Sequence, residues 1–363
     1  MPGTTLTVTA IKTRGVVVPM PRPLATGAGA VTTVPLMLVD LETRQGVTGR
    51  AYIFAFYASL LSAVCELTRN LGESLEGEPL APLALEAKLQ KALRLPGVQG
   101  LAMMALSGID MAAWDAYAQS LDLPLVRALG ATPQPVPTYN SNGLGIMGPE
   151  KAAKEAAELI APGFKAVKVR LGYPDIEADL AVIRAVRDAV PAGTALMSDY
   201  NQCLTVAEAT RRIARLDGEG LDWIEEPIRA DDYAGCAALC AKARTPIQIG
   251  ENFWGVNDME KALAAGSADL MMPDAARIGG VTGWLRTTGL AAAREIPLSS
   301  HLYPEVSTYL LAATPTAHWL EYVDWANPVL KDPLAIEGGN ATAPERPGAG
   351  IEWDEKAVAT YAA

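Results

Sequence analysis

Acidic residues end three successive apolar segments in the second half of the chain. Asp199 ends ALMSD, Glu225 lies in DWIEEP, and Glu251 follows IQIG. If these segments are neighbouring parallel strands, their carboxylates converge at one edge of a sheet. A single acid of this kind is more often a helix cap or an arginine partner, but three equivalent positions indicate a metal site. Such a site suits Mg²⁺, which prefers oxygen ligands, with Mn²⁺ as a substitute.

Cationic and imidazole side chains end further segments of the same kind. Lys168 and Arg170 lie two residues apart in the otherwise apolar KAVKVR, so on a strand both face the same, inward side. Asp274 in MMPDA and His301 in SSHL end two later, successive segments, where the carboxylate would fix the imidazole tautomer and raise its basicity. A lone histidine in an apolar strand is more often a core residue. The prediction of a general base therefore depends on the pairing with Asp274. Glu321 ends the eighth segment and completes the set of ionisable residues at the strand ends.

Eight apolar segments would position these residues. They recur every 20 to 30 residues or so, separated by Ala-rich amphipathic stretches such as KAAKEAAELI, and they are VPTYN, KAVKVR, ALMSDYN, DWIEEP, IQIGEN, DLMMPDA, IPLSSHL and AHWLE. Regular alternation of strand and helix is typical of a (β/α)8 barrel, in which the carboxyl ends of the strands share one mouth.

A separate domain precedes the barrel. Residues 6–56 alternate β-branched and polar residues between turn signals, which predicts an antiparallel sheet, and later stretches up to residue 114 have helical spacing. The Pro-rich TPQPVP follows. We expect an α/β protein: a modified TIM barrel at residues 134–324 with an α+β capping domain at residues 1–133, completed by the C-terminal segment 325–363.

The composition and charge of the chain argue against several classes of function. The chain has 363 residues, 50% of them hydrophobic and 20% charged, as in ordinary globular proteins. Its net charge of −11 argues against binding to nucleic acid or to an anionic membrane surface. The four cysteines are too few and too irregular for a disulfide framework. There is no signal-like start and no apolar run of membrane-spanning length, so we expect a cytoplasmic protein.

Several motifs together resemble a known family. SDYNQ, WIEEP, IGEN, MPDAARIGGVTGW, SSHL and LLAATPTAHWLE are similar, in order and spacing, to the mandelate racemase group of the enolase superfamily, and the likeness runs through nearly the whole chain. The resemblance implies Mg²⁺ bound by the three carboxylates and Lys168 neutralising a substrate carboxylate. It also implies the pair of His301 and Asp274 as base on the R face, a neutral Glu321 hydrogen-bonded to the developing enediolate, and substrate contacts from Ser141 and Asn201.

The implied reaction removes the α-proton of a small 2-hydroxy carboxylate, most simply to racemise mandelate or a related aryl or alkyl acid. Removal of this proton creates a second negative charge on one small group, so the site must stabilise charge by preorganised donors and a Lewis acid. The resemblance also points to a homo-oligomer, with an octamer as the expected state.

Arg170 departs from the family pattern. The resembling enzymes carry a lysine there, which serves as the base on the S face. A neutral arginine near pH 7.5 would cost on the order of 6 to 7 kcal/mol, because its pKa lies above about 12. We expect either a slower racemase or a reaction that uses only the His301 side. Arg277 resembles the corresponding residue of acid-sugar dehydratases, which makes an aldonate or aldarate dehydratase the alternative.

The expected capping domain favours an apolar substrate. The loop LATGAGAV contains Leu24 and Val31, and the segment IFAFY contains Phe54 and Phe56. These segments resemble lids that cover an aryl group, although the two phenylalanines could equally be core residues. A polyhydroxylated acid would leave hydroxyls unpaired against such walls, at roughly 1 to 3 kcal/mol each. We therefore expect an aryl or alkyl 2-hydroxy acid.

Three other functions fit the sequence less well. Residues 143–148, GLGIMG, match the G-x-G-x-x-G pattern of dinucleotide-binding folds, but no acid ends the next strand. A binding barrel that keeps the metal but has lost turnover through Arg170 is a second possibility. A serine hydrolase built on Ser299, Ser300 and His301 lacks a nucleophile elbow.

Overall fold

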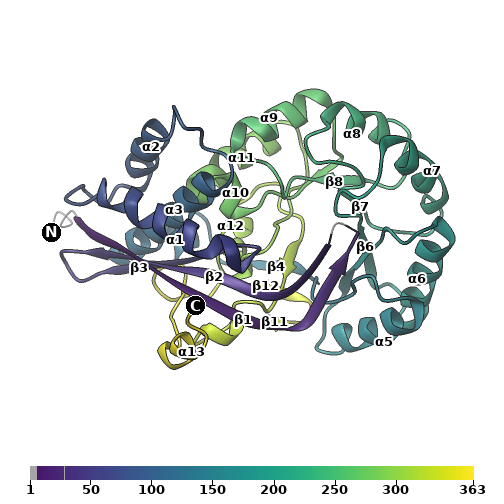
Figure 1. The fold of residues 1–363 in the computed structure, drawn as a ribbon, viewed down its shortest axis with the longest axis horizontal. Helices are drawn as coiled ribbons and strands as arrows, with labels where there is room; N and C mark the ends of the chain where they lie inside the picture. Colours follow the sequence, from purple (N-terminus) through teal and green to yellow (C-terminus); the bar gives the residue numbers. More distant parts are fainter. Residues whose placement is uncertain (1–5, 28) are drawn as a thin grey trace.

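The computed structural model describes residues 6–27 and 29–363, which form a sheet-and-helix domain beside a barrel ringed by helices (Figure 1). The first domain has a three-stranded antiparallel sheet in the order β1-β2-β3, with β1 at Val8–Thr26, β2 at Gly29–Thr43 and β3 at Thr48–Phe54. Its helices are α1 at Ala58–Glu73, α2 at Pro82–Ala92, α3 at Leu101–Ser120 and α4 at Leu125–Ala128. The long β1–β2 hairpin extends toward the barrel strands (Figure 1).

Helix α3 lies between the two domains. It packs against β3 on one side and against barrel helices α10 and α11 on the other. Most of its residues are therefore buried, including Met104, Ile109 and Trp114. A helix that is apolar on nearly every face needs such a position, because water would otherwise contact one of its faces.

The barrel strands are parallel and lie in chain order. They are β4 at Pro135–Asn140, β5 at Ala166–Arg170, β6 at Ala195–Asp199, β7 at Ile224–Glu225, β8 at Ile247–Ile249 and β9 at Leu270–Met271. Strand β10 at Leu320–Tyr322 pairs with β4 and closes the ring. The segment expected as a seventh strand forms only single bridges, in which Leu298 pairs with Met271 and Ala317, and His301 pairs with Asp274.

Helices follow the strands as expected for alternating units. They are α5 at Pro149–Ile160, α6 at Ile176–Ala189, α7 at Val206–Leu216, α8 at Tyr233–Cys240, α9 at Val256–Ala265, α10 at Ala275–Ile278, α11 at Gly280–Ala293 and α12 at Pro304–Ala312. Two of these helices, α10 and α11, follow β9, and a 3-10 helix, η1 at Asn327–Val329, follows β10 in place of an α-helix. The expected fold class, a modified TIM barrel with an α+β capping domain, is confirmed.

The C-terminal segment contacts both domains. It contains β11 at Ile336–Glu337, β12 at Asn340–Thr342 and α13 at Glu355–Thr360. Strand β12 pairs antiparallel with β4, so this part of the segment extends the barrel sheet. Later residues reach the capping sheet, where Trp353 Nε1 donates to Asp40 Oδ1 (2.8 Å), Val17 N donates to Tyr361 O (2.8 Å) and Ala363 N donates to Gly15 O (3.0 Å). Strand β12 pairs with residues 135–137 of β4, which precede the residues that pair with β10. The assignment of 325–363 to the capping domain stays a prediction.

The two ends of the barrel differ in character. A cluster of Tyr139, Ala166, Met197, Trp223 and Leu270 fills part of the barrel interior. The ionisable strand-end residues lie at the opposite, C-terminal ends of the strands. Among the described residues, no helix combines the length and apolar character needed to cross a membrane.

Candidate active site

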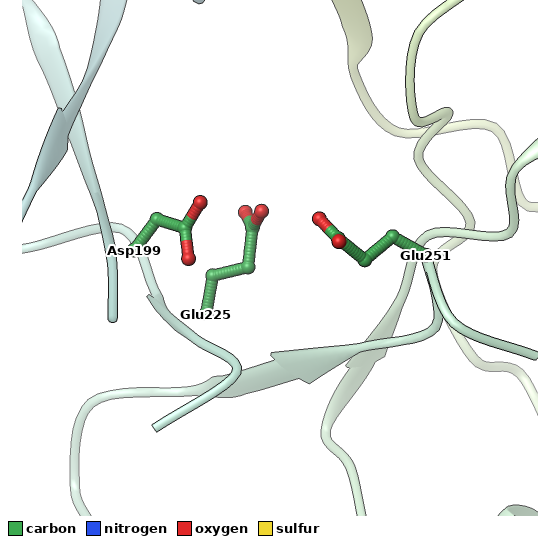
Figure 2. Close-up of side chains that lie close together, drawn as sticks. All are labelled: Asp199, Glu225 and Glu251. Atoms are coloured by element: carbon green, nitrogen blue, oxygen red, sulfur yellow. The ribbon is translucent and has the colours of Figure 1, made fainter. Parts of the chain in front are cut away.

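Three carboxylates converge at the barrel mouth, as Figure 2 shows. Asp199 ends β6, Glu225 ends β7, and Glu251 follows β8; one ligand oxygen from each lies within 4.8 Å of the others. The parallel register places Asp199 directly beside Glu225. Before Glu251, Gly250 adopts φ +138°, and a Cβ there would lie 2.8 Å from Met272 N. Glycine is therefore required for the sharp turn that aims Glu251 at the other two carboxylates.

The charge at this cluster calls for a cation. Glu225 is fully buried, and its pKa is raised to about 8, first by burial, against the lowering effect of Lys168, and then by the carboxylates of Asp199, Glu321 and Glu251. Three acidic oxygens this close repel one another unless a positive charge lies among them. An all-oxygen set with room for further ligands fits a hard divalent ion.

Lys168 contacts the same group of carboxylates from β5. Its Nζ lies 2.5 Å from Glu225 Oε1, 2.8 Å from Glu321 Oε1 and 3.5 Å from Asp199 Oδ2. Burial lowers the pKa of Lys168, but the surrounding carboxylates raise it by more, to well above its usual range. The side chain is therefore a fixed ammonium ion and a source of positive charge rather than a base.

His301 and Asp274 form the expected pair. His301 Nδ1 lies 2.6 Å from Asp274 Oδ2, while Ala276 N and Arg277 N, at the start of α10, donate to Asp274 Oδ1. The other ring nitrogen, Nε2, lies 3.2 Å from Glu251 Oε2. Burial lowers the pKa of His301, but nearby carboxylates, Glu251 first, raise it to about 9. A ring held through Nδ1 leaves Nε2 available for proton transfer.

Glu321 differs from our expectation of a neutral side chain. It accepts hydrogen bonds from Ser141 Oγ (2.7 Å) and Leu302 N (2.8 Å), in addition to its contact with Lys168. Burial raises the pKa of Glu321, but Lys168 and His301 lower it by more, to below the usual range. Every contact is from a donor or a cation, so this arrangement holds the carboxylate ion.

Arg170 is held entirely by acceptors. Its Nη1 donates to the carbonyls of Ser141 (2.8 Å) and Gly143 (3.0 Å), and its Nη2 donates to Ser141 Oγ (2.9 Å). These three bonds fix the plane of the guanidinium group and use three of its five N–H donors. Asn201 is also tied to the metal cluster, because its Nδ2 donates to Asp199 Oδ2 (2.8 Å).

The mouth opens into a cavity of about 300 Å³ between the barrel and the capping domain. The hairpin of β1 and β2 contributes Leu24 and Val31, and β3 with its following turn contributes Phe54 and Phe56. Most of the expected site residues line the same space: Lys168, Arg170, Asp199, Asn201, Glu251, His301 and Glu321. Three expected site residues do not line the cavity, but each is hydrogen-bonded to a residue that does: Ser141 to Glu321, Glu225 to Lys168 and Asp274 to His301.

The cavity wall is more polar than the sequence led us to expect. Arg277 lies with its Cζ 4.5 Å from the ring centre of Phe56 and 5.5 Å from that of Trp254. Gln202 and Asn252 also line the cavity, as does Trp325 from the C-terminal segment. Asn252 could have been suspected from its position directly after Glu251. Nothing in the pattern around Trp325 indicated a site residue.

The glycine-rich segment 143–148 serves the capping domain. Ile146 N donates to Ala25 O at the hairpin tip (2.7 Å), while Met147 N and Gly148 N both donate to Tyr173 Oη (2.9 and 3.0 Å). These backbone amides are the groups that would cradle a dinucleotide phosphate, and they already have protein partners. The segment therefore docks the hairpin rather than a nucleotide.

Comparison with known proteins finds two matching family models and similar enzymes. The chain matches the mandelate racemase / muconate lactonizing enzyme N-terminal domain over residues 9–130 and the enolase C-terminal domain-like family over residues 151–357. An L-talarate/galactarate dehydratase from Salmonella typhimurium is 31% identical over 329 residues, 90% of this chain and 82% of the relative.

Two solved structures are similar along their whole length. An enolase from alpha proteobacterium BAL199 with bound magnesium has a TM-score of 0.97 and 44% identity, covering 99% of this chain and 100% of that one. An enolase from Bradyrhizobium complexed with magnesium and mandelic acid has a TM-score of 0.95 and 42% identity, covering 99% of each chain. With the three carboxylates of this chain, these structures identify Mg²⁺ as the cofactor.

Proposed function

Because this chain belongs to the mandelate racemase/muconate lactonizing enzyme group of the enolase superfamily, we propose that it racemises a 2-hydroxy monocarboxylate with an aryl or alkyl substituent. The observation that carries the proposal is the convergence of His301, Lys168 and the carboxylate cluster on one cavity that Phe54 and Phe56 help to enclose. A hydroxy acid could place its carboxylate near the cations and its substituent near the aromatic rings.

The side chains divide the work of removing a proton. Bound Mg²⁺ supplies Lewis-acid stabilisation of the negative charge that develops on the substrate. Lys168 offsets part of the same charge, and its contacts with Glu225 and Glu321 keep it in place. We propose that His301 Nε2 accepts the α-proton while Asp274 holds Nδ1. Arg170 is the candidate donor for the opposite face, and its bonds to two carbonyls predict slow transfer there.

The charges around the cavity favour a substrate with one carboxylate. When His301 is neutral, as a base must be, the cations are Lys168, Arg170 and Arg277, and the anions are Asp199, Glu225, Glu251, Asp274 and Glu321. One divalent ion then balances these charges, so each carboxylate of a substrate adds one negative charge to a buried space. A monocarboxylate adds one such charge, whereas a dicarboxylate such as an aldarate adds two.

Deuterium exchange tests this function. The enzyme is incubated with Mg²⁺ in D₂O and with separate R and S enantiomers of mandelate and of lactate. We expect deuterium at the α-carbon with interconversion of the enantiomers, faster from the R side. Conversion of sugar acids to 2-oxo acids with no exchange into mandelate or lactate would contradict the proposal.

A dehydratase for aldonic acids is the second candidate. It is favoured by the polar residues Gln202, Asn252 and Arg277 along the cavity and by the bonds that hold Arg170 against two carbonyls, away from the role of a base. Elimination needs one base only: His301 takes the α-proton, the bond from C3 to its hydroxyl breaks, and the hydroxyl leaves as water with a proton from the protonated His301. A screen of aldonates for 2-oxo acid formation distinguishes this activity from racemisation.

A further inference from the structure

The turn that follows His301 has an unusual backbone. Leu302 and Tyr303 both have φ +51°, in the left-handed region that residues with a side chain rarely adopt. This turn directs Leu302 N to Glu321 Oε2 (2.8 Å) and lets His301 reach Asp274. Strained backbone of this kind persists only when surrounding contacts hold it.

The capping domain supplies such a contact. Phe54 N, at the end of β3, donates to Tyr303 Oη (3.0 Å), and both residues are buried. The ring of Tyr303 packs against that of Tyr52, with centroids 5.3 Å apart, and Tyr52 Oη donates to Glu305 Oε2 (2.5 Å). Two phenols therefore connect β3 to the start of α12, immediately after the proposed base.

The hydrogen bond from Phe54 N to Tyr303 Oη holds a residue that lines the cavity. The side chain of Phe54 lines the cavity and contacts the rings of Phe56 and Trp325, with centroids 4.5 and 5.2 Å away. The backbone N–H of the same residue is the group that binds Tyr303. Without this acceptor, Phe54 N would be buried with an unsatisfied hydrogen bond, and the end of β3 would shift to find one.

We propose that Tyr303 is a positioning residue that sets the spacing between the aromatic wall at Phe54 and the base His301. The inference rests on the proposed function, because the wall matters only for a substrate whose substituent contacts it. A bulky aryl acid is then oriented by the wall while its α-carbon faces His301. A small acid such as lactate hardly contacts the wall and is positioned by its carboxylate and hydroxyl groups alone.

Tyr303→Phe tests the proposal, because phenylalanine keeps the ring packing and removes only the acceptor. We expect kcat/KM for exchange of R-mandelate to fall about tenfold or more, since small displacements of a bound substrate have effects of this order. For R-lactate we expect a change of less than about threefold. Hydrogen exchange followed by mass spectrometry should also show faster exchange in residues 52–56, a readout that does not depend on turnover.

Tyr52→Phe is the matched control, because it removes the neighbouring phenol bond to Glu305 and leaves Phe54 N bonded. It should lower the melting temperature without changing the ratio of mandelate to lactate activity. Equal losses for the two substrates in Tyr303→Phe, or no loss for either, would overturn the positioning role while leaving the proposed function intact. If the unaltered enzyme exchanges neither acid, the proposed function fails, and this inference fails with it.

Discussion

The two histidines of the chain lie on neighbouring segments at opposite ends of the barrel, and their surroundings differ in charge. At the mouth, His301 contacts Asp274 and Glu251, and its pKa is raised to about 9 although burial alone lowers it. At the other end, His318 Nδ1 lies 3.3 Å from Ser299 Oγ, and its ring lies near Trp223, with centroids 6.0 Å apart. Burial lowers the pKa of His318 to about 4.

The comparison shows that carboxylates, rather than burial, decide what each histidine can do. A buried imidazole without an acidic partner is neutral and serves packing. The same ring beside carboxylates can hold a proton in a space that also holds a substrate. Repulsion among the carboxylates at the mouth destabilises the fold there, whereas burial of the apolar cluster around Trp223 and Tyr139 stabilises it.

The largest expected effect comes from disabling the metal cluster. Removal of Mg²⁺ by a chelator, or the change Glu225→Gln, should reduce α-proton exchange to the background rate, because the site loses its strongest source of positive charge. In the unaltered protein, Mg²⁺ at a hundred times its Kd should stabilise the fold by about 2.7 kcal/mol. Thermal unfolding with and without Mg²⁺ measures this response. A full response in Glu225→Gln would contradict the assignment of Glu225 as a ligand.

The two histidines can be compared directly by substitution. His301→Asn should reduce exchange of the R enantiomer by roughly 10² to 10⁴-fold, the usual contribution of a general base. His318→Asn should leave the rate within about threefold, because His318 lies at the far end of the barrel. Proton NMR in D₂O measures both rates. Comparable losses in the two variants would mean that both substitutions act by disturbing the fold, and that His301 is not the base.

Much of this arrangement could be predicted because strand ends follow simple rules. Period-two alternation and the repeat of apolar segments were sufficient to place Asp199, Glu225 and Glu251 around one mouth. The same reasoning identified the neighbours His301 and Asp274. These inferences depend on local patterns and on a closed barrel, both of which are visible in one sequence.

Other features depend on distances that no local pattern contains. The lowered pKa of Glu321 follows from the approach of Lys168 and Leu302 N, which no local pattern in the sequence indicates. Trp325 reaches the cavity through the path of the C-terminal segment, part of which pairs with β4. The contact of Arg277 with Phe56 joins the two domains, so it could not be anticipated from either alone.

A moderate effect on Mg²⁺ affinity is expected from Trp223, which connects the apolar cluster to the carboxylates at the mouth. Trp223 belongs to the apolar cluster, yet its Nε1 donates to Glu225 Oε2 (2.9 Å). Trp223→Phe keeps an aromatic ring but removes this bond, so Glu225 should be less well oriented. Hydrogen bonds of this kind typically change metal affinity by about 10 to 100-fold. Isothermal titration with Mg²⁺ measures the change, and an unaltered Kd would show that the apolar end does not support the metal site.

The smallest expected effect concerns stability in acid. The lowered pKa of His318 means that the unfolded chain binds a proton more tightly than the folded one between pH 6.5 and about 4. The stabilising contribution of neutral His318 is therefore complete above pH 6.5 and is lost as the pH falls through this range. His318→Asn should remove this part of the pH dependence, on the order of 2 kcal/mol after allowance for partial exposure. Urea unfolding at pH 7 and pH 4.5 measures it, and parallel curves for the two proteins would show that His318 is solvated rather than buried.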